Sequence, residues 1–89
     1  MPINNAAYAK SATATATPTA IETTHPEKYD EFQLFNDDAA IAITFVIVGA
    51  SVKVLAGESI GMNVRCSPNS ITVASASATP AYRVMAVGR

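Results

Sequence analysis

A strict alternation of apolar residues between positions 40 and 48 constrains the fold of this chain most strongly. One set of alternate positions carries Ile41, Ile43, Phe45 and Ile47, and the other carries Ala42, Thr44, Val46 and Val48. Residues two apart point to the same face of a β-strand, so these two sets would lie on opposite faces. β-branched side chains also disfavour a helix and pack well in a sheet. The pattern predicts a central strand over residues 40–48 that is covered on both faces.

Similar short segments, separated by turn residues, follow one another along the rest of the chain. Strands are predicted at residues 31–35, 52–55, 60–65, 71–73 and 81–87, and turns or loops at residues 36–38, 49–51, 56–58, 66–69 and 74–80. Asn, Asp and Gly in these turns tolerate backbone conformations that other residues avoid. Strands that recur about every 8–12 residues are typical of a sandwich or barrel. We therefore expect an all-β fold, a small antiparallel β-sandwich of Ig-like or jelly-roll-like type with six or seven strands.

The first 28 residues differ from the remainder. The stretch Ser11–Ala20 reads SATATATPTA, and large apolar residues are too sparse before Tyr29 to form a separate core. His25-Pro26-Glu27-Lys28 marks a break, which divides the chain into an extended N-terminal arm, residues 1–28, and a β-sandwich domain, residues 29–89. Three placements of the arm remain open: a strand added to a neighbouring subunit, an edge strand of the same domain, or a disordered tail.

The alternation of Thr and Ala in the arm has a period of two, which would place Thr on one face of a strand and Ala on the other. If the arm pairs with a neighbouring subunit, these residues and the next large apolar residue would make the contact. The candidate protein-interaction residues are Ala12, Thr13, Ala14, Thr15, Ala16, Thr17 and Ile21.

The chain has little interior with which to stabilise itself. A domain of 89 residues buries only about 60–65% of the surface that its unfolded chain exposes. Its one cysteine, Cys66, and its one histidine, His25, provide neither an internal disulfide nor four zinc ligands. Charged residues make up 15% of the chain, which suits a surface covered by neighbours. We expect an oligomer or a place in a larger assembly.

Composition argues against several classes of partner. The formal net charge of −1 gives no general attraction to nucleic acid or to anionic membranes. The longest apolar run, residues 39–50, is shorter than the about 20 residues that a membrane-spanning helix needs. An unpaired cysteine fits synthesis in a reducing cytoplasm. We expect neither a nucleic-acid nor a membrane partner.

The residues that could perform chemistry stand alone in the sequence. His25 lies beside Pro26 in the predicted break and is interpreted as a solvated loop residue. No histidine or cluster of cations near Cys66 would lower the pKa of its thiol, so a half-buried apolar role is favoured. The acidic pairs at residues 30–31 and 37–38 fall at strand ends and turns, where acidic residues are common. The sequence therefore predicts no enzyme, no catalytic residue, no metal and no cofactor.

The turns and strands together resemble a known family. The segments that carry the resemblance are Leu34–Asp38, the β-branched strand up to Val48, Leu55–Ser59 and Ala78–Val84. Over about two thirds of the chain, this pattern is similar to the small β-sandwich virion proteins of tailed bacteriophages. The resemblance implies a capsid decoration or cement protein on the virion surface, which bridges and stabilises subunits of the major capsid protein.

Two alternatives remain beside this interpretation. The chain could be another phage virion component, such as a neck, tail or fibre-attachment protein. From a different class, it could be a small ligand- or carbohydrate-binding β-module. Such modules usually expose Trp or Tyr on a sheet face, but this chain has no Trp and its three tyrosines are far apart in sequence.

Overall fold

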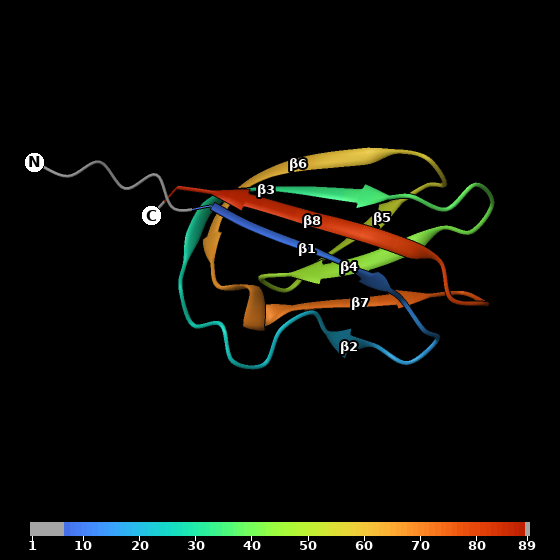
Figure 1. Ribbon diagram of the computed structural model, residues 1–89, viewed down its shortest axis with the longest axis horizontal. Helices are drawn as coiled ribbons and strands as arrows, with labels where there is room; N and C mark the ends of the chain where they lie inside the picture. Colours follow the sequence, from blue (N-terminus) through green and yellow to red (C-terminus); the bar gives the residue numbers. More distant parts are fainter. Residues whose placement is uncertain (1–6, 89) are drawn as a thin grey trace, which may run out of the picture.

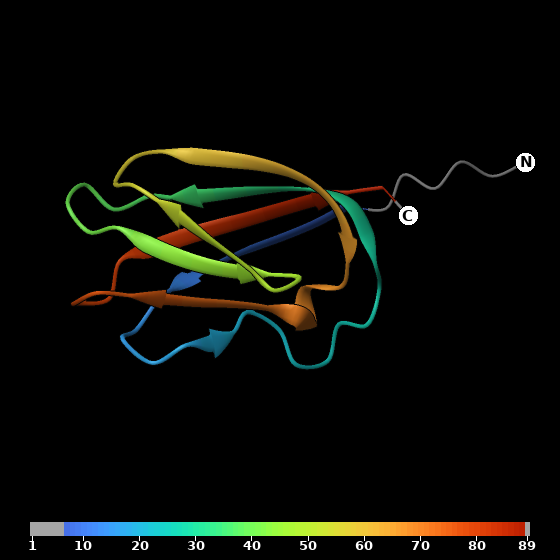
Figure 2. The same cartoon turned by 180° about the vertical axis from the view of Figure 1, so that it is seen from behind.

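The computed structural model describes residues 7–88 and shows two four-stranded antiparallel sheets packed face to face (Figures 1 and 2). Sheet A has the order β1 (Ala7–Thr13), β8 (Ala81–Val87), β3 (Tyr29–Asn36) and β6 (Ser59–Cys66). Sheet B has the order β2 (Thr19–Ala20), β7 (Ile71–Ser75), β4 (Ile43–Ile47) and β5 (Ala50–Val54). A short 3-10 helix, η1 (Pro68–Ser70), precedes β7. The all-β sandwich predicted from the sequence is confirmed.

The strands pair in a nested order. β1 pairs with β8, β2 with β7, β3 with β6 and β4 with β5, and every pair is antiparallel. Eight strands in two sheets with this connectivity form a jelly roll. Of the two predicted sandwich types, the jelly roll is therefore correct and the Ig-like type is wrong. The strand count of six or seven was too low, because β2 has only two residues and leaves no alternation in the sequence.

The core lies between the two sheets and is built from alternate residues of each strand. Phe45 at the centre of β4 is fully buried and meets the ring of Tyr82 edge-on, at 5.7 Å between ring centroids. Leu34 of β3 and Val84 of β8 fill the sheet A side of the same core. The inward and outward alternation predicted for residues 31–35 and 81–87 is confirmed in these two strands.

The predicted central strand differs from β4 in length and in cover. β4 spans Ile43–Ile47 rather than residues 40–48, and residues 39–40 form a bend before it. The inward residues Ile43 and Ile47 are buried, but Thr44 and Val46 on the outer face are only half-buried. The prediction that both faces are covered was wrong within the described chain. An antiparallel sheet commonly packs one face on the core and leaves the other in solvent.

Residues 7–21 belong to the sandwich of the same chain, the second of the three placements left open by the sequence. β1 pairs with β8 along seven residues, and Tyr8, Ala14 and Ile21 are part of the buried core. The predicted division at residue 28 therefore does not separate an arm from the sandwich. Residues 22–28 form no strand and connect β2 to β3. Residues 1–6 of the predicted arm lie outside the described residues.

The turn after β3 is organised by two side chains. The buried Asn36 donates from Nδ2 to the backbone oxygens of Ile41 and Val54, at 2.7 and 3.0 Å, and its Oδ1 accepts from the backbone N–H of Asp38. These bonds connect β3 of sheet A to the end of β5 in sheet B. Side chains of Asn36 and Asp38 thus bond the backbone of the turn predicted at residues 36–38. Within the described residues, no helix is long and apolar enough to cross a membrane.

Replacing Asn36 with alanine should destabilise the fold by about 2–4 kcal/mol, because two backbone oxygens lose a buried donor and a small cavity remains. Urea denaturation followed by circular dichroism would measure the loss. Asn63→Ala is the matched control, since Asn63 is exposed on β6 and should change stability by less than about 0.5 kcal/mol. Equal effects of the two substitutions would contradict the role assigned to Asn36.

Asp38 gives the turn a dependence on pH. Its Oδ2 accepts hydrogen bonds from the backbone N–H groups of Ala40 and Ile41, both at 2.8 Å, and these bonds lower the pKa of Asp38. The unfolded chain therefore binds a proton at this carboxyl at a higher pH than the folded chain does. The stabilising contribution is present above the ordinary pKa of Asp and is lost as the pH falls through the lowered value.

Acidification from about pH 6 to about pH 2.5 should therefore lower the urea midpoint more for the native chain than for Asp38→Asn. Asparagine keeps an accepting oxygen but does not ionise, and all other carboxyl groups are common to both proteins. An identical pH profile for the two chains would show that Asp38 does not contribute.

Candidate interaction site

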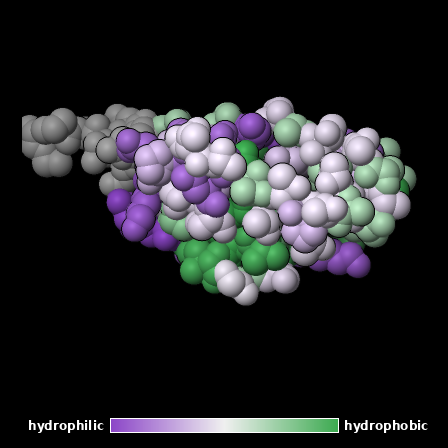
Figure 3. Space-filling model, turned by 90° about the horizontal axis from the view of Figure 1, so that it is seen from below, coloured by the Kyte–Doolittle hydropathy of each residue, from purple (hydrophilic) through white to green (hydrophobic). Residues whose placement is uncertain are grey.

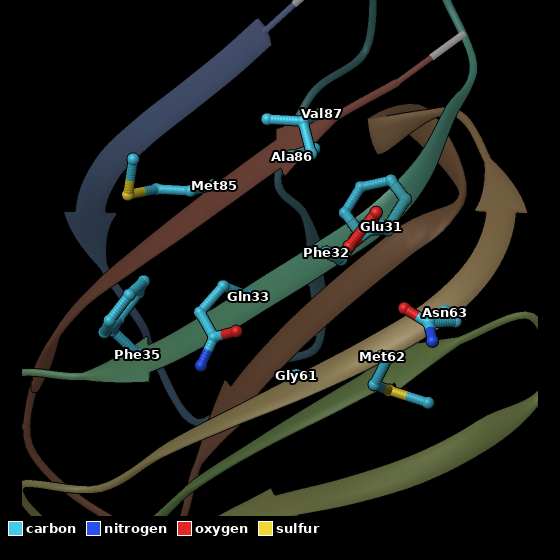
Figure 4. Close-up of a pocket in the computed structure, with 10 residues that line it drawn as sticks. All are labelled: Glu31, Phe32, Gln33, Phe35, Gly61, Met62, Asn63, Met85, Ala86 and Val87. Carbon is cyan, nitrogen blue, oxygen red and sulfur yellow. The ribbon is translucent and has the colours of Figure 1, made fainter.

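A hollow of about 250 Å³ opens on the outer face of sheet A, over β3, β6 and β8 (Figure 4). Its floor is at Gly61 of β6, beside Gln33 of β3, with which Gly61 is paired across the ladder. A Cβ atom at residue 61 would lie 2.9 Å from Oε1 of Gln33. The absence of a side chain at Gly61 therefore creates the hollow. Its lining consists of Glu31, Phe32, Gln33, Phe35, Gly61, Met62, Asn63, Met85, Ala86 and Val87.

One side of the hollow is an exposed apolar surface. Met85 and Val87 of β8 point outward and are 45% and 49% exposed. Across the ladder they lie beside Ala9 and Ala7 of β1, whose small side chains leave both larger residues uncovered. We call these four residues, Ala7, Ala9, Met85 and Val87, the apolar platform. The sequence already indicated this platform, because residues 84–87 are apolar at both sets of alternate positions. These residues were not assigned to a site from the sequence.

The arginines of this face are each paired with an aspartate. The guanidinium of Arg83 donates from Nε and Nη2 to the two carboxylate oxygens of Asp37, at 2.7 and 3.1 Å, and lies 4.3 Å above the ring centroid of Phe35. Arg65 donates a single hydrogen bond, from Nη1 to Oδ1 of Asp30, at the other end of the sheet. Both cations are compensated within the chain, so the face offers apolar contact rather than a track for phosphates.

The interaction residues predicted from the sequence do not form one surface. Ala14 and Ile21 are buried, and the N–H of Ala14 donates to the backbone oxygen of Pro80. β1 ends at Thr13, so the Thr/Ala alternation of the sequence corresponds to two strand faces only up to that residue. Thr15 already belongs to the turn toward β2. Ala12 is half-buried in the inner row of β1, and Thr13, Thr15, Ala16 and Thr17 are exposed. Contact of the exposed members with another subunit stays a prediction.

An aromatic cluster that the sequence reasoning missed joins three segments at one end of the sandwich. The His25 ring stacks on Tyr29, with its Nε2 2.8 Å from the Tyr29 hydroxyl, and lies 4.8 Å from the ring of Tyr8. The backbone N–H of His25 donates to Oδ1 of Asn69 at 2.9 Å. His25 is half-buried, so its interpretation as a solvated loop residue was wrong. The cluster holds residues 22–28 against both β1 and β3.

The polar edge of this cluster is a bonded group of three side chains. The Tyr8 hydroxyl donates to Oε2 of Glu22 at 2.9 Å, and Nζ of Lys10 lies 3.7 Å from the same oxygen. Burial, followed by the bond to Glu22, raises the pKa of Tyr8 far above its usual range. The hydroxyl therefore stays protonated and serves as a structural donor.

The surroundings of Cys66 suit a structural role rather than a reactive one. Cys66 ends β6 with 7% exposure, and burial raises the pKa of its thiol, which opposes nucleophilic attack. This agrees with the role predicted for it. Among the described residues, no group of three or more His, Cys, Asp or Glu side chains could hold a metal ion.

A second exposed apolar point lies at the tip of the β4–β5 hairpin. The turn was predicted at residues 49–51 but consists of Val48 and Gly49, whose φ angles of 49° and 80° match a type I′ turn. Val48 is 58% exposed, and a β-branched residue at positive φ is strained. Val46 is half-buried on the outer face of the same sheet. Figure 3 shows strongly hydrophobic surface gathered in the lower half of its view.

Comparison with known proteins shows the fold but not a family. No family model matches the chain, and no curated protein matches it either. Among solved structures, the chain is similar to a protein of Bacillus endospore appendages, described as disulfide-linked pili. That similarity has a TM-score of 0.67 at 19% identity and covers 98% of this chain and 89% of the other.

A salicylate 1,2-dioxygenase variant from Pseudoaminobacter salicylatoxidans is also similar, with a TM-score of 0.51 at 11% identity. The similarity covers 93% of this chain but only 21% of the dioxygenase. One of these proteins is a pilus component and the other is an enzyme. At such identities the likeness concerns the sandwich fold alone, and one fold serves many functions.

Substituting Val48 with asparagine should stabilise the protein by about 1 kcal/mol, because asparagine adopts positive φ with less strain than valine. Urea denaturation would measure the gain. Gly49→Ala is the matched substitution at the neighbouring turn position and should destabilise, since it introduces a Cβ where φ is 80°. A loss of stability in Val48→Asn would show that the valine is not strained.

Proposed function

We propose that the protein is a non-catalytic structural subunit that docks onto a larger protein assembly through the outer face of sheet A. The apolar platform carries this proposal. Met85 and Val87 are each about half exposed, and they lie beside a hollow on a face whose arginines are already paired. Such a surface is matched by an apolar protein surface with one side chain projecting into the hollow.

The energetics suit an interface contact of this kind. Burying the exposed halves of Met85 and Val87 is worth roughly 1 kcal/mol each, on the scale of about 1.5–3 kcal/mol for complete burial. A few well-packed residues commonly carry most of the binding energy of an interface. The hollow, at about 250 Å³, is smaller than the pockets of roughly 300–1,000 Å³ that hold small ligands. This favours a side chain of a partner over the free ligand of a binding module.

The specific form that we favour is a decoration protein on a bacteriophage capsid, with the major capsid protein as partner. The turn and strand pattern described above supports it, and jelly rolls are a recurrent architecture of viral capsid proteins. Each copy bound to the assembled shell would stabilise the shell by mass action. A homo-oligomer such as a trimer would let one molecule bridge several capsid subunits. A neck, tail or fibre-attachment role would use the same surface on a different part of the virion.

A filament subunit is the second candidate, because the likeness to the pilus protein covers almost the whole chain. The linkage described for those pili is not reproduced by this sequence. A single cysteine can form one intermolecular disulfide, which joins two chains and cannot continue along a filament. Cys66 is in addition buried. A filament of this protein would therefore be held by noncovalent contacts.

The way the polar side chains are used also supports a non-catalytic role. Asp30 and Asp37 are bound to arginines, and His25 is bound to Tyr29. These interactions fix loops and strand ends, and none of these groups lines the hollow. Glu31 is the one ionisable residue of its lining, and the other lining side chains are apolar, aromatic or amide groups that would not assist it as a base.

Substituting Met85 with lysine should weaken binding to capsids assembled without the protein by at least about tenfold, because a charge would replace the apolar contact. Sedimentation of the protein with the capsids measures binding. Ser51→Lys is the matched control, since Ser51 is exposed on β5 of sheet B and should bind as the native chain does. Equal thermal melting of both variants would exclude unfolding as the cause. Full binding by Met85→Lys would refute docking through the platform.

A further inference from the structure

The two sheets leave one long side of the sandwich with an incompletely covered apolar row. β6 is the edge strand of sheet A on this side and runs along the upper side of the molecule in Figure 1, and β5 is the edge strand of sheet B. The inward residues Val52, Ile60, Met62 and Val64 pack against the core but are only half-buried. We call these four residues the β5–β6 seam. Equivalent inward residues of β3 and β8, such as Leu34 and Val84, are fully buried.

The outer edge of β6 has no paired strand, because β6 is eight residues long and pairs with β3 on one side only. Proteins usually protect such edges with proline, lysine, a bulge or a very short strand. β6 contains neither proline nor lysine. Its pairing with β3 is regular from Ser59 to Asn63, and the register shift lies beyond Asn63, near Arg65 and the end of the strand. The opposite edge of the same sheet, β1, carries Lys10 at its centre.

We propose that a second copy of this chain covers the seam. β6 pairs antiparallel with β6 of the second copy around a two-fold axis, so that sheet A continues as eight strands and the two seams pack together. This inference rests on the proposed function in one respect, since both assume that the chain acts by associating with other protein subunits. It concerns a different surface, because the apolar platform lies on the outer face and the seam lies at the edge.

Side-chain chemistry favours β6 of the second copy over its β1. Pairing β6 with β1 would set the seam against Lys10, whose ion pair with Glu22 would have to be desolvated. Pairing β1 with β1 would bring two Lys10 side chains together, which is unfavourable. Pairing β6 with β6 sets apolar residues against apolar residues. Arg65 then faces the small residues at the start of the partner strand and keeps its bond to Asp30.

The area available is enough for a reversible dimer. Eight residues at about 3.3 Å each give a strand of roughly 26 Å. With a molecular depth of 20 Å, the side of the sandwich has roughly 500 Å² on each copy, and about 1,000 Å² would be buried in total. This is the lower limit for a specific interface, so we expect dissociation in the micromolar range rather than a permanent dimer.

Light scattering after size-exclusion chromatography, from about 1 to about 200 µM protein, tests the proposal. The native chain should shift from the mass of one chain toward that of two. Met62→Lys should raise the dissociation constant at least about tenfold, because it places a charge within the seam. Ser11→Lys is the matched control: it places the same charge on the exposed face of β1, at the opposite edge of the sheet, and it should still dimerise.

Cross-linking tests the two-fold geometry even if Met62→Lys is poorly folded. Residues near the centre of an antiparallel pair of identical strands lie beside their own copies, at distances that a disulfide can span. In a Cys66→Ser background, Asn63→Cys should therefore give a covalent dimer on oxidation. Ser11→Cys, on the exposed face of β1, should remain monomeric under the same conditions.

Each outcome supports or overturns one arrangement of the strands. A native chain that stays monomeric throughout, with no Asn63→Cys cross-link, overturns the proposal. Cross-links that form only in a mixture of Asn63→Cys and Ser11→Cys chains show pairing of β6 with β1 and overturn the two-fold arrangement. A monomer that binds capsids would refute the seam and leave the proposed function standing. A dimer that does not bind capsids would support the seam and refute the proposed function.

Discussion

The nested antiparallel pairing of the strands is the constraint on which the rest of the structure depends. β1 and β8, at the two ends of the described chain, pair residue for residue and form one edge of sheet A. The next pairs inward alternate between the two sheets, so the chain folds as one long hairpin rolled onto itself. Every buried residue of the core depends on this order. The segment before residue 22 is therefore an integral part of the sandwich.

Local alternation made much of this predictable, and its failures have physical causes. Buried and less buried residues alternate from residue 31 to the end of β3 and along the whole of β8, and the sequence identified both strands from the alternating sets of residues. β2 was missed because two residues cannot show a period, and β4 was drawn too long because Ile41 and Ala42 continue its pattern outside the strand. The pairing of β1 with β8 joins residues about 75 positions apart, so no local signal could reveal it.

The candidate surfaces were harder to foresee than the fold. The apolar outer residues of β8 were visible in the sequence, but their exposure depends on the alanines of β1 that stand beside them. The half-burial of Met62 and Val64 likewise depends on β6 being an edge strand, which only the sheet order shows. His25 was misjudged because its neighbours, Tyr8 and Tyr29, come from two other strands. Residue type alone did not indicate these contacts.

The rolled-hairpin topology also affects how the chain folds during its synthesis. The β4–β5 hairpin is the innermost pair and joins neighbouring segments, so it can form early. β1 leaves the ribosome before the other strands, but its partner β8 is the last of the eight strands to be synthesised. During that interval the edge of β1 has no partner of its own, and many chains growing side by side would present the same free strand. Pairing with β8 ends that interval, and because a pair so distant in sequence forms slowly, the free edge of β1 is where strands could be exchanged between chains.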